Sequence, residues 1–255
     1  MKTILEILKR KWAEYLLEIL VIIIGILGAF VLNNWSEVRK EKAIEQNYLS
    51  RLYADLQNDR EILTFSKDLT EIRMSQINLL IDAIQNPDLS SEKPKQIIES
   101  IEKVTWLSYL PLSRIVYNEL LNSGKMSLIQ SEELRKQLAI YSAEIDHWEI
   151  ILNNKVSQKE FANATAGLLS IEILTAIENS ESTDPLKSSH NLDIEIAPNE
   201  VKRIIQELSS NSDAVKWFPQ IYHYHVLAAK VIDELKAQVE FLIEFIEDQL
   251  ENHNL

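Results

Sequence analysis

The chain contains no cysteine in its 255 residues. It therefore has no disulfide framework, no thiolate metal site and no cysteine nucleophile. Glycine is also scarce, and its four copies (Gly25, Gly28, Gly124 and Gly167) are too dispersed for a turn that cradles a phosphate or a dinucleotide. We accordingly expect no cofactor. Only six prolines interrupt the chain, and its abundant Leu, Ile, Glu, Lys and Gln favour helix throughout.

Positive charge is likewise in short supply. The chain has 26 Lys and Arg against 39 Asp and Glu, which gives a formal net charge of −13. Phosphate affinity comes from Lys and Arg contacts, so nucleic acid is not an expected partner. An anionic lipid surface would also repel so acidic a domain. Solubility is the commoner reason for such acidity.

One apolar run stands out, and it reads LLEILVIIIGILGAFVL from Leu16 to Leu32. With its flanks it reaches the roughly 17–25 residues that a membrane-spanning helix needs. Trp12 and Tyr15 precede it and Trp35 follows, as in the aromatic belts at the two membrane interfaces. A buried core helix and a cleaved signal peptide are the alternatives. The run is apolar on all faces, unlike a surface helix, and no small-residue cleavage pattern follows it.

Basic residues near the two ends of this run predict its orientation. The preceding segment carries Lys2, Lys9, Arg10 and Lys11, and the following one carries Arg39, Lys40 and Lys42 among acidic residues. The side richer in Lys and Arg tends to remain in the cytoplasm. We therefore predict a cytoplasmic N-terminus (1–15), a transmembrane helix (16–34) and an extracytoplasmic helical domain (35–255). In a bacterium this is a single-pass inner-membrane protein with a periplasmic domain.

Five anchor residues share one helix face, namely Glu18, Ile22, Gly25, Ala29 and Asn33. Gly25 and Ala29 form a small-xxx-small pair that allows close approach of a second helix. This pattern predicts a homo-oligomer formed through the transmembrane helix, although a chance match remains the alternative. Glu18 is an ionisable group within the span and is a candidate for a proton relay or for coupling to a partner helix. The competing interpretation is that it reaches the nearby interface.

Beyond the anchor, apolar residues recur at helical spacing. Between Ser36 and Asn86 there is neither Gly nor Pro, so we predict a helix that runs straight out of the membrane. One stripe comprises Leu49, Leu52, Leu56 and Leu63, and the next comprises Phe65, Leu69, Ile72, Gln76, Leu79 and Ala83. Between the stripes, Gln57–Glu61 is polar throughout, so the helix is expected to be fully solvated or broken there.

Three later segments complete the predicted domain. Strict heptad spacing, typical of antiparallel helix packing, links Leu134, Leu138, Tyr141, Ile145, Trp148 and Leu152. Pro219–Glu251 predicts a long helix that could pair with the helix before Asn86. The polar stretch 179–198 is predicted to be a flexible loop. The fold class is therefore all-α, with one N-terminal transmembrane helix followed by a bundle of long antiparallel helices.

Two groups of residues are candidates for chemistry. Glu144 and His147 form a Glu-x-x-His pair, but di-iron bundles need this pair twice and no second copy exists, so we interpret it as a polar patch and expect no metal. An aromatic and histidine cluster forms a candidate ligand or partner patch comprising Trp217, Tyr222, His223, Tyr224 and His225. The two histidines are two residues apart and point away from each other on a helix. Core or rim packing is the commoner role for such a cluster.

The anchor resembles that of an uncharacterised family of short bacterial single-pass envelope proteins. The matching residues are Glu18-Ile19, Gly25-Ile26-Leu27, Ala29 and Asn33-Asn34-Trp35, and a second landmark is Tyr117, Glu119-Leu120, Ser123-Gly124, Leu128-Ile129, Leu134-Arg135 and Tyr141. Ser36 stands where the family usually has Asn, and Leu17 stands where it often has Gly. The resemblance implies a membrane anchor and an all-helical domain, and it implies no activity.

Together these patterns predict a membrane-anchored helical module without enzymatic activity. It would bind an unidentified protein partner or sense a ligand on the outer side of the bilayer, as a scaffold or a sensor. The alternatives are an envelope enzyme that uses acidic residues and a Glu18-dependent transmembrane coupling or proton relay.

Overall fold

A computed structural model describes residues 2–86, 88–106, 110–180 and 194–252. Every regular element in these residues is a helix, which confirms the all-α prediction. The elements are α1 (Lys2–Gln85), α2 (Leu89–Glu92), α3 (Pro94–Lys103), α4 (Ile115–Asn122), the 3-10 helix η1 (Met126–Leu128), α5 (Glu132–Leu152), α6 (Val156–Ala164), α7 (Ile171–Asn179), α8 (Pro198–Ser210), α9 (Ser212–Val215) and α10 (Phe218–Asn252).

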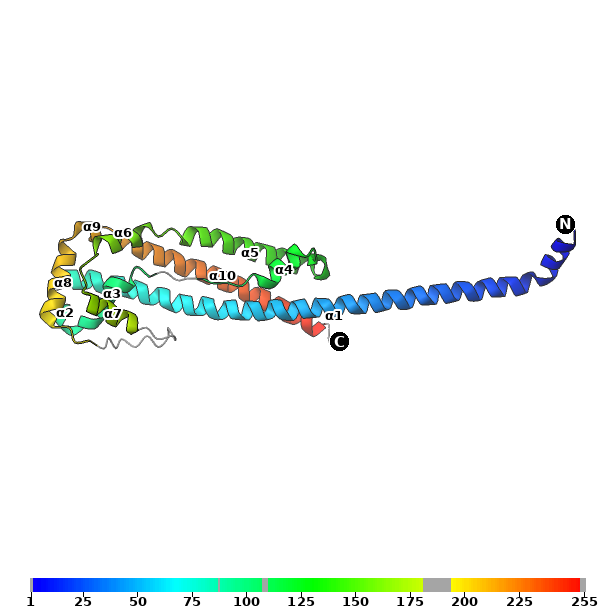
Figure 1. Ribbon diagram of the computed structural model, residues 1–255, viewed down its shortest axis with the longest axis horizontal. Helices are drawn as coiled ribbons and strands as arrows, with labels where there is room; N and C mark the ends of the chain where they lie inside the picture. Colours follow the sequence, from blue (N-terminus) through cyan, green and yellow to red (C-terminus); the bar gives the residue numbers. More distant parts are fainter. Residues whose placement is uncertain (1, 87, 107–109, 181–193, 253–255) are drawn as a thin grey trace.

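Helix α1 extends from the apolar run to the far tip of the molecule without a break (Figure 1). It is the one helix in the described residues that is long and apolar enough to cross a membrane, judged by length and composition. The side chains of its apolar stretch, residues 16–32, are all exposed. Because no Gly or Pro follows until Pro87, the backbone can remain helical through Gln85. The predicted single long helix leading out of the apolar run is thus confirmed.

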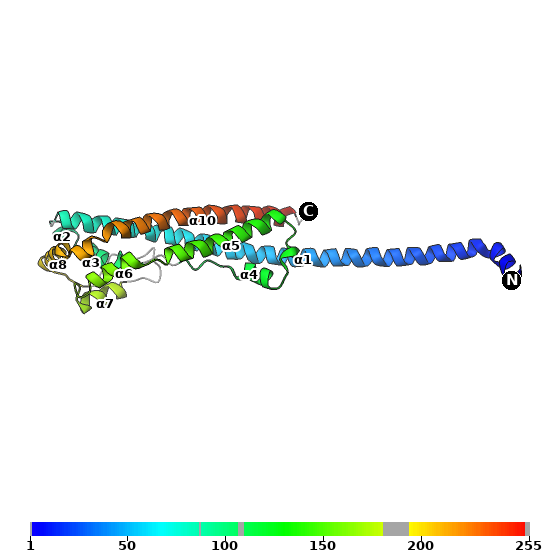
Figure 2. The same ribbon diagram turned by 90° about the horizontal axis from the view of Figure 1, so that it is seen from above.

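Helix α10 lies along α1 over much of its length, and the two helices run in opposite directions (Figures 1 and 2). Three side-chain pairs connect the two helices in this antiparallel order. The Tyr53 hydroxyl donates to Glu247 Oε1 at 2.8 Å, Arg60 lies 3.6 Å from Glu240, and Lys67 contacts Asp233. From one pair to the next, the residue number on α1 rises by seven and the residue number on α10 falls by seven. Each pair therefore lies two helical turns from the next.

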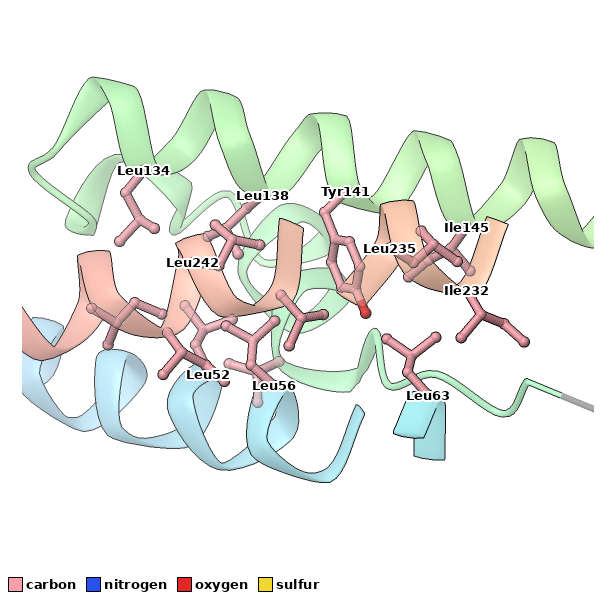
Figure 3. Close-up of a cluster of buried hydrophobic side chains, with 14 of the residues drawn as sticks. Leu52, Leu56, Leu63, Leu134, Leu138, Tyr141, Ile145, Ile232, Leu235 and Leu242 are labelled. Carbon is pink, nitrogen blue, oxygen red and sulfur yellow. The ribbon is translucent and has the colours of Figure 1, made fainter. Parts of the chain in front are cut away.

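The half of the domain nearer the apolar run has its own core, which we call the proximal core. It is built mainly from α1, α5 and α10 and includes Leu52, Leu56, Leu63, Leu134, Leu138, Tyr141, Ile145, Ile232, Leu235 and Leu242 (Figure 3). The heptad predicted on α5 is confirmed, since its members are buried except for the half-buried Trp148. Helix α5 begins at the Ser131 N-cap, whose hydroxyl accepts from the Leu134 N–H at 3.2 Å.

The far half contains a separate distal core. Short helices gather there around the ends of α1 and α10, and its members include Ile77, Leu80, Ile97, Ile98, Ile101, Phe161, Ile173, Ile177, Val201, Ile204, Ile205, Leu208 and Ile221. Gly167 has a φ of +84° between α6 and α7, a conformation that favours glycine because it lacks a Cβ. The loop predicted at 179–198 falls largely on residues 181–193, outside the described part of the chain.

The buried positions of α1 follow one uninterrupted seam. From Leu49 to Leu80 the seam alternates steps of three and four residues and comprises Leu49, Leu52, Leu56, Asp59, Leu63, Ser66, Thr70, Arg73, Ile77 and Leu80. The predicted second stripe beginning at Phe65 is therefore wrong for all its members except Ala83, because the others are only half-buried. The apolar residues there flank the seam, while polar side chains occupy it.

Candidate functional site

Asp59 is the most deeply buried carboxylate in the proximal core, with none of its surface exposed. Its Oδ1 accepts from the Ser113 N–H at 2.7 Å, and its Oδ2 accepts from the Tyr141 hydroxyl at 2.9 Å. One side chain of α1 therefore holds both α5 and the connector before α4, residues 110–114. The prediction of a solvated or broken helix at Gln57–Glu61 is wrong, because α1 continues and Asp59 faces the core.

Two more carboxylates of α1 bind backbone N–H groups of the following segment. Asp55 accepts from the Val116 N–H at 3.3 Å, and Glu45 accepts from the Gln130 N–H at 2.7 Å. Val116 lies in the first turn of α4, whose own N-cap residue, Arg114, provides no side-chain cap. The first-turn N–H groups of a helix have no partner within the helix. Asp55 thus supplies from α1 the cap that α4 lacks.

A cavity of about 20 Å³ adjoins this group of residues. Asp55, Ser113, Tyr117 and Tyr141 are among the residues that line it. The Ser113 Oγ is buried and has no hydrogen-bond partner among the described residues. The walls are mostly apolar, formed in part by Leu52, Leu56 and Leu138, and a few polar groups reach the space. A space of this size has room for one water molecule, which those polar groups could bind. An organic substrate would not fit.

The environment of Asp59 changes its protonation behaviour. Burial raises the pKa of the Asp59 carboxyl to about 6, although the hydrogen bonds from Ser113 and Tyr141 act to lower it. The negative charge of Asp55 adds to the increase. Burial also raises the pKa of the Tyr141 hydroxyl, as does the adjoining Asp59. Arg114, which lines the cavity, directs its guanidinium to Asp146 and Glu149 on α5. Asp59 itself pairs with no cation among the described residues.

A second buried polar group, the polar layer, separates the two cores along α1. Its members are less than a tenth exposed and comprise Ser66, Thr70, Arg73, Lys103 and His225. Arg73 from α1 and Lys103 from α3 both lie over the Trp106 ring, at 5.4 Å and 5.5 Å from its centroid. Such cation–π contacts favour a desolvated cation. The layer therefore keeps two positive side chains within the protein.

His225 is the polar-layer residue contributed by α10. Its Nε2 lies 3.2 Å from the Val104 carbonyl oxygen, which favours the tautomer that donates from Nε2. Its Nδ1 is buried without a partner in the described part of the chain. Burial lowers the pKa of His225 to about 4, although the hydrogen bond with the Val104 carbonyl acts to raise it. The positive charge of Arg73 also lowers it. The imidazole is therefore neutral at pH 7.

The predicted aromatic and histidine patch is divided among different surroundings. Tyr222 and His223 are exposed on α10, whereas the Tyr224 hydroxyl donates to the Leu152 carbonyl at 3.1 Å within the proximal core. Trp217 is half-buried against the distal core. The structure thus brings Tyr224 and His225 together, as an edge-to-face pair with centroids 5.3 Å apart. The remaining members lie elsewhere.

The other predicted residues lie on exposed helix surfaces. All five members of the anchor face are exposed on α1. Trp12 and Trp35 are exposed, and the Arg39 guanidinium lies over the Trp35 ring at 5.6 Å. The side chain of Tyr15 lies outside the described part of the structure. His147 is exposed beside Trp148, and the described residues contain no group of three His, Asp or Glu side chains placed to hold a metal ion.

An open hollow of about 510 Å³ lies on the outer surface of α1 and α10. Its lining carries charges of both signs around one aromatic ring and comprises Arg60, Glu61, Thr64, Phe65, Asp68, Lys236 and Glu240. Ligand pockets usually bury most of the surface of the ligand. A hollow as open as this one would leave a small molecule largely exposed.

Comparisons with known proteins connect this architecture with one family. No curated protein and no solved structure matches the chain. The family match covers residues 18–186, from the apolar run of α1 through α7, and leaves α8, α9 and α10 outside. The expected resemblance to an uncharacterised family is confirmed in that coarse form. Because the match spans more than half of the chain, the protein belongs to DUF6090, a family of unknown function.

Proposed function

We propose that this protein is a single-pass inner-membrane protein that presents an antiparallel helical bundle on the outer side of the bilayer. Residues 1–15 lie in the cytoplasm, 16–34 span the membrane, and 35–255 form the outer domain. Its role is non-enzymatic: it binds a protein partner or senses a ligand there. The observation that carries this proposal is the unbroken α1, which joins the exposed apolar run to both cores.

The surface of the apolar run supports insertion into lipid. Most of its side chains are large, apolar and exposed, and a contiguous apolar surface of this size marks a membrane or protein contact. Trp12 and Trp35 flank the run on the exposed surface of the same helix, where an aromatic residue suits the level of the lipid headgroups. The lipid bilayer is accordingly the first partner that we propose.

A reporter that is active only in the cytoplasm tests the orientation. Fused after Leu255, it should be inactive, whereas the same reporter fused before Met1 should be active. Strong activity from the fusion after Leu255 would reverse the proposed orientation. The pair of fusions controls for expression, because both are carried by the same full chain.

The helical phase of α1 supports self-association through the anchor. The anchor-face residues Ile22, Gly25 and Ala29 each precede a buried seam residue, Leu49, Leu52 and Leu56 respectively, by 27 residues. At ~3.6 residues per turn, this separation is about seven and a half turns. The anchor face therefore points away from the buried seam. Two copies can bring their anchors together while their outer domains lie on opposite sides.

Single cysteines at Ile22, Gly25, Ala29 and Leu27 test this contact by disulfide trapping in membranes. The first three should trap efficiently, and Leu27, on the opposite side of the helix, should not. Gly25→Leu should reduce trapping because it separates the two backbones. Gly28→Leu is the matched control and should leave trapping unchanged. Uniform trapping at all four positions would contradict the proposed face.

The open hollow is the proposed contact for the protein partner. A photo-crosslinking residue at Thr64, within the hollow, should capture one specific protein in native membranes. The same residue at Ile171, which is exposed on α7, serves as the control. Equal capture at the two positions would assign the partner to another surface. We propose no reaction for Asp55 and Asp59, because the cavity beside them admits one water molecule.

A further inference from the structure

The connector 110–114 and α5 are held on α1 by one buried carboxylate. We propose that Asp59 is a proton-binding clasp: uptake of a proton fastens the connector and α5 to α1, and its release loosens them. This inference rests on the proposed function for its setting, since a domain outside the membrane experiences the pH of its surroundings. It names the proton as a ligand that the domain senses.

The ionised clasp carries a negative charge without a counterion. Asp59 uses both oxygens on neutral donors, the Ser113 N–H and the Tyr141 hydroxyl. Asp55, one turn earlier on α1, adds a second negative charge. Arg114 on the connector is bound to carboxylates of α5. Helix α4 contributes Tyr117 to the adjoining cavity, and α10 contributes apolar residues to the proximal core, including Leu235 and Leu242.

The site around Asp59 can accommodate an added proton. A proton taken from solvent onto Asp59 Oδ2 would be donated to the Tyr141 oxygen. The hydroxyl hydrogen of Tyr141 must then turn elsewhere, and Tyr141 lines the small cavity. One water molecule there can accept this hydrogen and bind the unpartnered Ser113 Oγ. The neutral clasp therefore keeps each polar group paired, and Asp59 Oδ1 continues to accept from the Ser113 N–H.

The clasp responds to acidification by closing. When the connector is undocked, water reaches Asp59 and its pKa returns to the ordinary 3.8; when it is docked, the pKa is about 6. The docked state therefore binds the proton more tightly, because its Asp59 pKa is about two units higher. By linkage, acidification favours docking by up to roughly a hundredfold. This gain is complete below pH 4 and is lost as the pH rises past 6.

Amide hydrogen exchange of the full chain in phosphatidylcholine nanodiscs tests the clasp. The measured quantity is the protection of the Ser113 and Val116 N–H groups between pH 4 and 7.5, corrected for the intrinsic exchange rate. In the wild type, protection should rise on acidification towards a hundredfold. In Asp59→Asn, the amide donates to Tyr141 at every pH, so protection should be high and independent of pH. Asp55→Asn is the control, and it is followed at the Ser113 N–H because Asp55 itself binds the Val116 N–H. It should shift the midpoint to lower pH and keep the pH dependence.

A carboxyl carbon NMR titration of the wild type needs no variant and gives an independent result. Asp59 should titrate near pH 6, and the Ser113 and Val116 protection should follow the same midpoint. An Asp59 midpoint near 4, or protection that falls in acid, would overturn the clasp. So would an unchanged pH dependence in Asp59→Asn. These measurements use purified protein, so their failure leaves the topology fusions and the anchor trapping to decide the proposed function separately.

Discussion

The proximal and distal cores are built in different ways. The proximal core uses long stretches of α1, α5 and α10, and carboxylates of α1 bind backbone N–H groups of the segment that crosses it. The distal core gathers short helices around the ends of the two longest ones. In a long helix, the repeating pattern of apolar residues indicates which face is buried. In a set of short helices, the turns between them determine how they pack. The two halves of one domain thus differ in how strongly the local sequence specifies them.

The proximal core and the polar layer carry buried titratable groups with opposite pH responses. Asp59 in the proximal core has a raised pKa, and His225 in the polar layer has a lowered one. Acidification from pH 7 to 4 therefore stabilises the surroundings of Asp59 and destabilises those of His225. The two contributions fall in overlapping pH ranges. They have opposite signs in the total free energy of unfolding. Only measurements on separate regions or variants can distinguish them.

The largest expected effect comes from emptying the distal core. Phe161 is fully buried and lies against Phe218, with ring centroids 5.5 Å apart. Phe161→Ala should lower the free energy of unfolding by about 3–5 kcal/mol. Hydrogen exchange should accelerate in α3 and α8 more than in α5. Ile171→Ala, on the exposed surface of α7, is the control and should change stability by less than about 0.5 kcal/mol. Equal acceleration in α5 would show that the two cores unfold as one unit.

The next effect separates the two pH responses. The unfolded chain takes up a proton at His225 near pH 6.5, whereas the folded chain does so only near pH 4. In the Asp59→Asn background, the free energy of unfolding should therefore fall by up to about 3 kcal/mol between these pH values. In the His225→Gln background, it should rise on acidification instead. Urea unfolding of the full chain in detergent micelles measures both trends. Parallel trends would refute the opposition between the two regions.

A smaller effect compares one helix cap from each region. The Ser131 hydroxyl accepts from the Leu134 N–H at 3.2 Å in the proximal half, and the Ser170 hydroxyl accepts from the Ile173 N–H at 3.4 Å in the distal half. Ser131→Ala and Ser170→Ala should each cost about 1 kcal/mol. Exchange should accelerate only in the helix that has lost its cap. Acceleration spreading from α7 into α5 would contradict the separation.

The smallest effect tests the pairing of α1 with α10. Lys67→Asp should destabilise the protein by less than about 1 kcal/mol, because the contact with Asp233 is partly exposed. Asp233→Lys alone should have a similar cost. The double variant should recover most of the loss, since the pair is restored with its charges exchanged. Additive losses in a double-mutant cycle would place the two residues apart.

How far the sequence predicted this fold depends on which residues occupy the seam. The α5 heptad was predictable because its members are apolar and evenly spaced. The α1 seam beyond Leu63 was mispredicted because Phe65, Leu69 and Ile72 are apolar, yet Ser66, Thr70 and Arg73 are the residues that face inwards. Extending the three-four alternation from Leu56 past Asp59 would have located them. Periodicity was thus a better guide than side-chain polarity.

The candidate site was hardly predictable from sequence. The spacing between Leu56 and Leu63 places Asp59 in the seam, but nothing local identifies Ser113 and Tyr141 as its partners, which lie 54 and 82 residues away. His225 was selected for its aromatic neighbours, whereas its surroundings come from Arg73 and Val104. Buried polar groups are paired through tertiary contacts. Such partners become visible only once the helices are assembled.

In the proposed topology, the unbroken course of α1 also determines how far from the membrane each core stands. From Trp35 to Gln85 the helix advances 50 residues, or about 75 Å at ~1.5 Å per residue. With Trp35 at the headgroups and the helix upright, the clasp stands about 35 Å above the bilayer and the distal core begins near 60 Å. In that topology, a partner embedded in the same membrane would meet the proximal half first, and the distal half would be the part of the domain farthest from the bilayer.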